Sequence, residues 1–149
     1  MYGSPFGRIL VGVNGTSEAE RATAVAISLA KSLEAHLIVF GVIAPLSSET
    51  QAEGVGLDEA SQARADLEAQ VQATGAKAVE LGIDVITEIV EGDPEKEIEH
   101  KIEEAAVDLV VVGHRDISRI RHWLEGSTSE GLIRNSRTSI LIVHDDHPQ

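Results

Sequence analysis

Residues 113–131, "GHRDISRIRHWLEGSTSEG", bring together the residue types that hold phosphate groups. Gly126 is followed directly by three hydroxyl residues, Ser127, Thr128 and Ser129, at the start of a predicted helix. Glycine lets the backbone approach an anion closely, and the free amides and the dipole of a helix N-terminus favour negative charge. The stretch therefore predicts a phosphate site in which the hydroxyl groups are additional donors.

Two features of the same stretch favour other interpretations. Ser127 and Glu130 form a capping box, which needs no ligand. Asp116 places a carboxylate where an anion would approach, and two like charges about 4 Å apart repel by a few kcal/mol at an effective dielectric near 20. A bridging Mg²⁺ or a ligand with less charge, such as AMP, would relieve this repulsion. So would an outward turn of the carboxylate toward Arg115 or Arg119, which we expect because basic neighbours are plentiful.

The charge of the chain excludes several classes of partner. The net charge is −13, so nucleic acid and anionic membranes would both be repelled. Sixteen of the 25 carboxylates fall within residues 49–104, whereas five of the twelve basic residues are arginines within residues 115–137. The chain has no cysteine, and no stretch approaches the roughly 20 apolar residues of a membrane span. We therefore expect a cytoplasmic protein that binds neither nucleic acid nor membrane.

Predicted strands and helices alternate along the chain. Apolar runs predict strands at residues 8–13, 36–43, 84–90, 108–114 and 139–144. Helices are expected from Ser17, over residues 57–81, over residues 94–106 and from Ser127. Ser17 and Glu20 form a capping box at the first helix, and Asp93 with Pro94 marks the start of the third.

Apolar stripes indicate which side of each helix packs on the sheet. At three- and four-residue spacing, the stripes contain Ala22, Val25, Ala26, Leu29 and Leu33 in the first helix, Ala60, Ala63, Leu67, Val71 and Ala78 in the second, and Ile98 and Ile102 in the third. The fourth and fifth strands lack polar alternation, which is typical of strands covered on both faces.

This alternation predicts one α/β domain over residues 1–149, built on a doubly wound, five-stranded parallel sheet with helices on both faces. In such folds, ligands bind at the carboxyl ends of the strands, where the strand order reverses. The loops that follow the first, second and fourth strands are therefore the expected walls of a site. They are residues 12–16, residues 41–45 and the stretch from residue 113 onward.

Three segments resemble the universal stress protein family: "RILVGVNGTSEAERA", "EGDPEKEI" and "VVVGHRDISRIRHWLEGSTSEGLIRNSRTSILIVH". Members that bind ATP share a glycine, two residues, a second glycine, nine residues, and then a glycine with a serine or threonine. Gly113, Gly126 and Ser127 keep this spacing, but Asp116 stands at the second glycine. Asn14 stands where ATP-binding relatives usually carry an aspartate, near the ribose or adenine.

The resemblance implies the strand order 3-2-1-4-5, a homodimer through the last strand, and an adenine nucleotide, ATP or AMP, with or without Mg²⁺. Val13 and Val42 are the expected apolar walls for adenine. The candidate binding residues are Gly12, Val13, Asn14, Val42, Val112, Gly113, His114, Arg115, Asp116, Gly126, Ser127, Thr128 and Ser129. We predict no catalytic residue and no resident metal ligand.

Three functions remain open from the sequence. The first is a stress-response or signalling module that binds an adenine nucleotide. The second is a dimeric interaction protein of the same fold whose site is degenerate and free of nucleotide. An enzyme is the weakest interpretation, because no general base is evident and His114 has no triad partners, so any ATP hydrolysis would be slow. His144 and His147, in the terminal "HDDHP", could bind a metal, but they lie in a polar tail, and we expect no metal site there.

Overall fold

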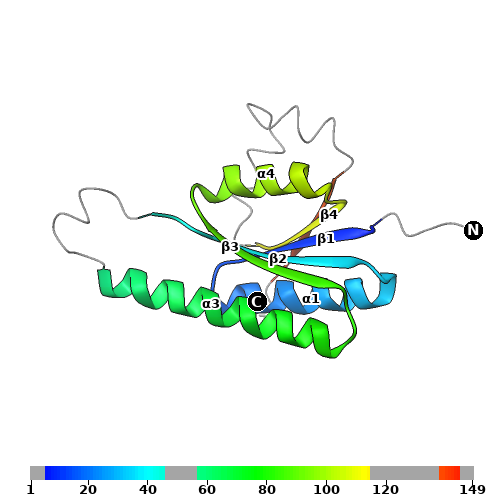
Figure 1. Ribbon diagram of the computed structural model, residues 1–149, viewed down its shortest axis with the longest axis horizontal. Coiled ribbons are helices and arrows are strands. Elements are labelled where there is room, and N and C mark those ends of the chain that lie inside the picture. The colour runs from blue at the N-terminus through cyan, green and yellow to red at the C-terminus, as the bar shows by residue number, and fades with distance from the viewer. Residues whose placement is uncertain (1–5, 46–56, 115–137, 145–149) are drawn as a thin grey trace, which may run out of the picture.

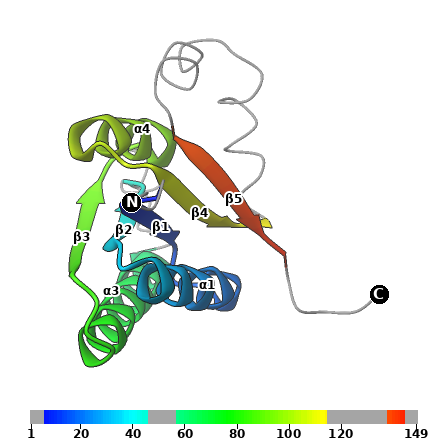
Figure 2. The ribbon, with the colours of Figure 1, turned by 90° about the vertical axis from the view of Figure 1, so that its right-hand side faces the viewer.

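The computed structural model describes residues 6–45, 57–114 and 138–144. Within these ranges lie the strands β1 (Arg8–Val13), β2 (His36–Ile43), β3 (Val85–Glu91), β4 (Leu109–Gly113) and β5 (Ser139–Val143), and the helices α1 (Ser17–Leu33), α3 (Leu57–Glu80) and α4 (Pro94–Ala105). The strands form one parallel sheet in the order β3-β2-β1-β4-β5, which confirms the predicted fold and order (Figure 1 and Figure 2).

Helices cover both faces of this sheet (Figure 2). Helices α1 and α3 lie on one face, over a core that includes Ile9, Val11, Leu37 and Val39. Helix α4 lies on the other face, over a second core. All five residues of β4 are buried, as its unbroken apolar sequence predicted, because its two faces contribute to the two cores.

The predicted stripe of α1 is confirmed, since its members are buried in the first core or packed against it. The predicted capping box of Ser17 and Glu20 is wrong. The N-cap is Thr16 rather than Ser17, and the Thr16 side chain makes no capping hydrogen bond. The physical reason is a competing local turn, in which the Thr16 hydroxyl donates a 2.6 Å hydrogen bond back to Asn14 Oδ1.

Helix α3 has nearly the predicted bounds, but its apolar stripe packs only in part. Leu67, Val71 and Ala78 are buried, whereas Ala63 is exposed. Figure 1 shows the beginning of α3 reaching past the ends of the central strands, where the sheet offers nothing to cover it. The spacing of the alanines predicted a helix correctly, but did not predict how far along the helix the sheet extends.

Helix α4 begins as predicted, with Asp93 as the N-cap and Pro94 as the first residue. The Asp93 side chain makes no capping hydrogen bond, and the Asp93 carbonyl accepts from Glu97. Ile102 is buried and Ile98 packs beside it in the second core. The helix predicted from Ser127 lies outside the described residues. Among the helices that are described, none is long and apolar enough to cross a membrane.

Candidate functional site

The carboxyl ends of β1 and β4 separate at the centre of the sheet. Pairing between β1 and β2 covers six residue pairs and continues to Val13 and Gly41. Pairing between β1 and β4 covers three pairs and ends at Val11 and Val111, although both strands continue for two more residues. The strand order reverses at this point, because the chain proceeds from β1 toward one edge of the sheet and returns with β4 on the other side. This is where α/β sheets bind ligands.

Seven of the predicted site residues lie along this edge. They are Gly12, Val13 and Asn14 at the end of β1, Val42 near the end of β2, and Val112, Gly113 and His114 at the end of β4. The structure brings these segments together, as neighbouring parallel strands require. The other six, which are Arg115, Asp116, Gly126, Ser127, Thr128 and Ser129, lie outside the described residues.

The two valines expected to flank adenine face opposite sides of the sheet. Val13 is 5% exposed and belongs to the core under α1 and α3. Val42 is half-buried and packs against the core under α4. Val42 therefore has side-chain surface left for a ligand on the α4 side, whereas Val13 supports the strand end from the other face.

The loop after β1 is organised by the Asn14 side chain. Asn14 Oδ1 accepts hydrogen bonds from the backbone N–H of Thr16, at 3.1 Å, and from the Thr16 hydroxyl. A backbone N–H can only donate, so the atom facing it is the side-chain oxygen. The Asn14 side chain is exposed, and within the described residues its Nδ2 group has no hydrogen-bond partner. Asn14 can therefore offer donors, rather than acceptors, to a ligand at this edge.

Gly15 brings the same loop into direct contact with α3. Its φ is +84°, and a Cβ at this position would lie 3.0 Å from the backbone nitrogen of Leu67. Leu67 in turn occupies the space over Gly41, where an added Cβ would lie 2.9 Å from the Leu67 Cδ1 atom. One residue of α3 thus packs against the ends of both β1 and β2, in positions that only glycine leaves open.

Gln70 also joins α3 to this loop, and the sequence offered no signal for it. The Gly15 N–H donates to Gln70 Oε1 at 2.8 Å, and Gln70 Nε2 donates to the Thr16 carbonyl at 2.8 Å. A glutamine on a helix with many polar residues is ordinarily solvated. It is the packing of α3 on the sheet that brings this side chain within hydrogen-bonding distance of the loop after β1.

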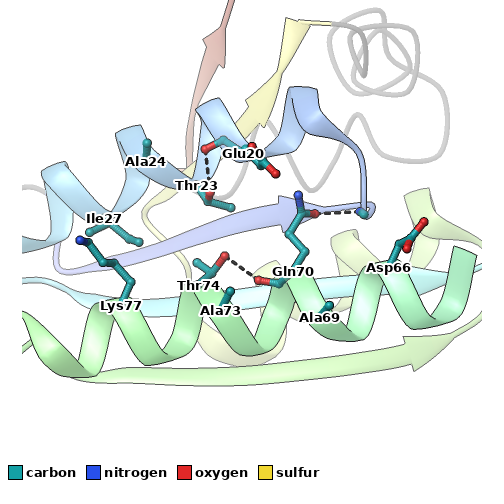
Figure 3. Close-up of a pocket in the computed structure, with 11 residues that line it drawn as sticks. Glu20, Thr23, Ala24, Ile27, Asp66, Ala69, Gln70, Ala73, Thr74 and Lys77 are labelled. Carbon is teal, nitrogen blue, oxygen red and sulfur yellow. Dashed lines mark hydrogen bonds between the residues drawn. The ribbon is translucent and has the colours of Figure 1, made fainter.

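Gln70 lines a groove of about 580 Å³ between α1 and α3. Figure 3 shows Asp66 and Lys77 toward its two ends, with small side chains such as Ala69 and Ala73 between them. Thr23 and Thr74 are buried beside the groove, and their hydroxyls donate to carbonyls of their own helices. The groove meets the candidate nucleotide edge at Gly15.

At the β4–β5 side of the edge, the rings of His114 and His144 lie 4.5 Å apart between centroids and are tilted by 31°. Arg21 Nε of α1 donates to the His144 carbonyl at 3.0 Å, so α1 also holds the end of β5. His147 lies outside the described residues. Within the described part of the chain, no three His, Asp or Glu side chains gather as metal ligands would.

Comparison with known proteins gives consistent matches. The model of the Universal stress protein family matches residues 5–144. Universal stress protein YxiE of Bacillus subtilis (strain 168) is 29% identical over 146 residues, covering 93% of this chain and 99% of that protein. A universal stress protein crystallised in complex with cAMP superposes with a TM-score of 0.65 at 29% identity, covering 95% of this chain and 99% of the other. A family member from Burkholderia pseudomallei, at 22% identity, shares the fold with a TM-score of 0.69 over 95% and 98% of the two chains.

Proposed function

Because this chain belongs to the universal stress protein family, we propose that it is a stress-response or signalling module that binds an adenine nucleotide at the carboxyl edge of its sheet. The observation that carries the proposal is the separation of β1 and β4 beyond Val11 and Val111. Beyond these residues the two adjacent strand ends are not paired with each other, so their backbone groups can bind a ligand. The relative crystallised with cAMP supports the choice of an adenine nucleotide.

In the proposed complex, the ribose lies near Gly113 and Asn14. The Asn14 Oδ1 atom is occupied by Thr16, so Nδ2 is the group available to a ribose hydroxyl or to a ring nitrogen of adenine. Adenine contacts the half-buried side chain of Val42, and Val13 backs the strand end from the opposite core. The nucleoside is thus held by one apolar surface and one amide.

The phosphates are proposed to bind the backbone amides of Gly126, Ser127 and Thr128, which the sequence motif places at a helix N-terminus. Asp116 replaces the second glycine of that motif and adds a negative charge near the phosphates. We therefore propose that AMP and ADP compete well with ATP, since each additional phosphate brings more charge close to the carboxylate.

Asp116 also favours a second candidate function, a dimeric interaction protein of the same fold with a degenerate, nucleotide-free site. The two functions differ in one measurable respect. Titration calorimetry with ATP, ADP, AMP and cAMP, with and without Mg²⁺, gives heats of binding under the first proposal. Under the second it gives none with any nucleotide.

The Asp116→Gly variant tests the role given to the carboxylate. Its affinity for ATP should rise by roughly tenfold, whereas its affinity for AMP should rise less, because the phosphates of ATP extend nearest to the removed charge. The measurement is the ratio of the ATP and AMP dissociation constants in the two proteins. An unchanged ratio contradicts the role of Asp116 without affecting the binding proposal.

A further inference from the structure

We infer that Gln70 is a positioning residue for nucleotide binding, which holds the loop of residues 14–16 in the arrangement that receives the ribose. This inference rests on the proposed function. Gln70 touches no candidate ligand position itself. It acts on the ligand through the backbone of the loop.

The Gln70 side chain uses both ends of its amide on two consecutive loop residues. Its oxygen accepts from the Gly15 N–H and its nitrogen donates to the Thr16 carbonyl, each at 2.8 Å. Figure 3 shows the side chain extending from α3 to the loop that joins β1 to α1. A paired donor and acceptor fix the orientation of the loop as well as its distance, which a single hydrogen bond or an apolar contact would not do.

The helix that carries Gln70 is itself anchored to the sheet. Leu67 and Val71, the neighbours of Gln70 on the inward side of α3, are 3% and 5% exposed in the first core. The side chain of Leu67 also fills the space above Gly41. Gln70 therefore ties the loop to a helix whose inward side is buried in the first core.

The connection continues from the loop to the group proposed to contact the nucleotide. Thr16 donates through its backbone N–H and its hydroxyl to Asn14 Oδ1. A displacement of Thr16 would consequently rotate the Asn14 side chain, and with it the Nδ2 donors that are proposed to contact the ligand. Gln70, Thr16 and Asn14 form a chain of hydrogen bonds from the core to the proposed ribose site.

These linked hydrogen bonds predict which part of the ligand is bound less tightly when Gln70 is replaced. The ribose is common to AMP, ADP and ATP, so loss of the Gln70 amide should weaken all three by the same factor. If the loop then holds its binding arrangement only about a tenth of the time, affinity falls about tenfold, because the observed dissociation constant rises as the competent fraction falls. Removal of Asp116, by contrast, is expected to change the ratio between nucleotides.

The test compares Gln70→Met and Gln70→Ala with wild type and with Gln72→Met. Methionine retains the length of the side chain but not its amide, and alanine is the strongest helix former, so both variants should fold. Gln72 is exposed on the same helix and serves as the matched control. Calorimetry with AMP and ATP, well below the melting temperature, should show about tenfold weaker binding by both Gln70 variants and unchanged binding by Gln72→Met.

Amide hydrogen exchange supplies a readout that does not depend on the ligand. In both Gln70 variants, exchange at Gly15 should accelerate, while exchange at Val11 inside β1 stays as in wild type. Nucleotide affinity that is unchanged in Gln70→Met would overturn the positioning role, as would losses that differ between AMP and ATP. If wild type itself binds no nucleotide, the proposed function and this inference both fail, and exchange at Gly15 then reports only whether Gln70 braces the loop.

Discussion

Asn14 at the end of β1 determines which kind of hydrogen bond the loop can offer a ligand. One side of its amide is used by Thr16, and the other presents N–H donors. An aspartate in its place would retain the turn through one oxygen and present a charged acceptor through the other. We predict that Asn14→Asp weakens ATP binding severalfold without Mg²⁺, because the new charge repels the nucleotide, and that Mg²⁺ restores it.

The measurement for Asn14→Asp is calorimetry with ATP in EDTA and in excess Mg²⁺, on wild type and variant. AMP serves as the control ligand, because its binding should depend less on Mg²⁺ bridging the carboxylate and the phosphates. An equal response to Mg²⁺ in the two proteins would show that residue 14 lies too far from the phosphates to share a metal ion with them.

Helix α4 is joined to β3 by Lys101, a cation whose side chain is mostly shielded from solvent. The side chain of Lys101 is 11% exposed, lies 6.0 Å from the centroid of the Phe40 ring, and is hydrogen-bonded to Glu88 of β3 and, at 3.1 Å, to Glu104. The hydrogen bond that Lys101 donates to Glu88 is the main reason that the pKa of Lys101 is raised above its ordinary value of 10.5. The hydrogen bond from Lys101 likewise lowers the pKa of Glu104.

Glu88→Gln should lower the free energy of unfolding by about 1 kcal/mol at pH 7, because it removes a charged acceptor from a nearly buried cation. This loss of stability is small for a charged pair, because Glu88 is partly solvated and Lys101 keeps its hydrogen bond to Glu104. Lys101→Met should lower the free energy of unfolding by less than Glu88→Gln does, since it leaves no unpaired charge over Phe40. Urea denaturation of the two variants measures both effects. Glu88→Gln as stable as wild type would show that Glu104 alone satisfies Lys101.

The sign of the pH dependence follows from the two shifts. Because the pKa of Lys101 is higher in the folded protein, the interactions of its protonated side chain stabilise the fold fully below pH 10.5. This contribution is lost as the pH rises through the pKa of the folded state. The difference between wild type and Glu88→Gln should therefore persist at pH 9 and shrink above pH 10.5. The lowered pKa of Glu104 has the opposite sense, so its contribution is present above pH 4.5 and is lost as the pH falls through the folded value.

For the whole molecule, the apolar edge strand β5 predicts assembly. Within the described residues, β5 pairs only with β4, and Ile140, Leu141 and Ile142 remain half-buried. An uncovered apolar edge of this kind promotes pairing with another chain. We predict a homodimer through residues 139–143, which Ile142→Lys should dissociate, whereas Ile86→Lys on β3 at the opposite edge should not.

Sedimentation at micromolar concentration tests this assembly. Ile86 is 45% exposed, so lysine at this position controls for the general effect of an added charge on an edge strand. A monomeric wild type contradicts the prediction, and dissociation by Ile86→Lys alone would place the interface on β3 instead.

The sequence by itself determined the elements and the order in which they alternate. Unbroken apolar runs predicted β4 and β5, three- and four-residue spacing predicted α1, and Asp93 with Pro94 predicted where α4 begins. These features depend on neighbours a few residues apart, so local pattern is enough to reveal them. Three segments, at the first strand and its turn, before the third predicted helix, and from the fourth strand to the fifth, together indicated the universal stress protein family, and the match over residues 5–144 confirms it.

Only the tertiary structure decided how those elements meet. The opposite faces of Val13 and Val42 follow from the register of β1 and β2, and the exposure of Ala63 follows from where the sheet ends beneath α3. Gln70 acts on Gly15, 55 residues earlier in the chain. The hydrogen-bond partners of Gln70 were decided by the packing of Leu67 and Val71 on the sheet, which brings two distant segments within hydrogen-bonding distance. Neither segment carries a periodic sequence pattern that would predict this contact.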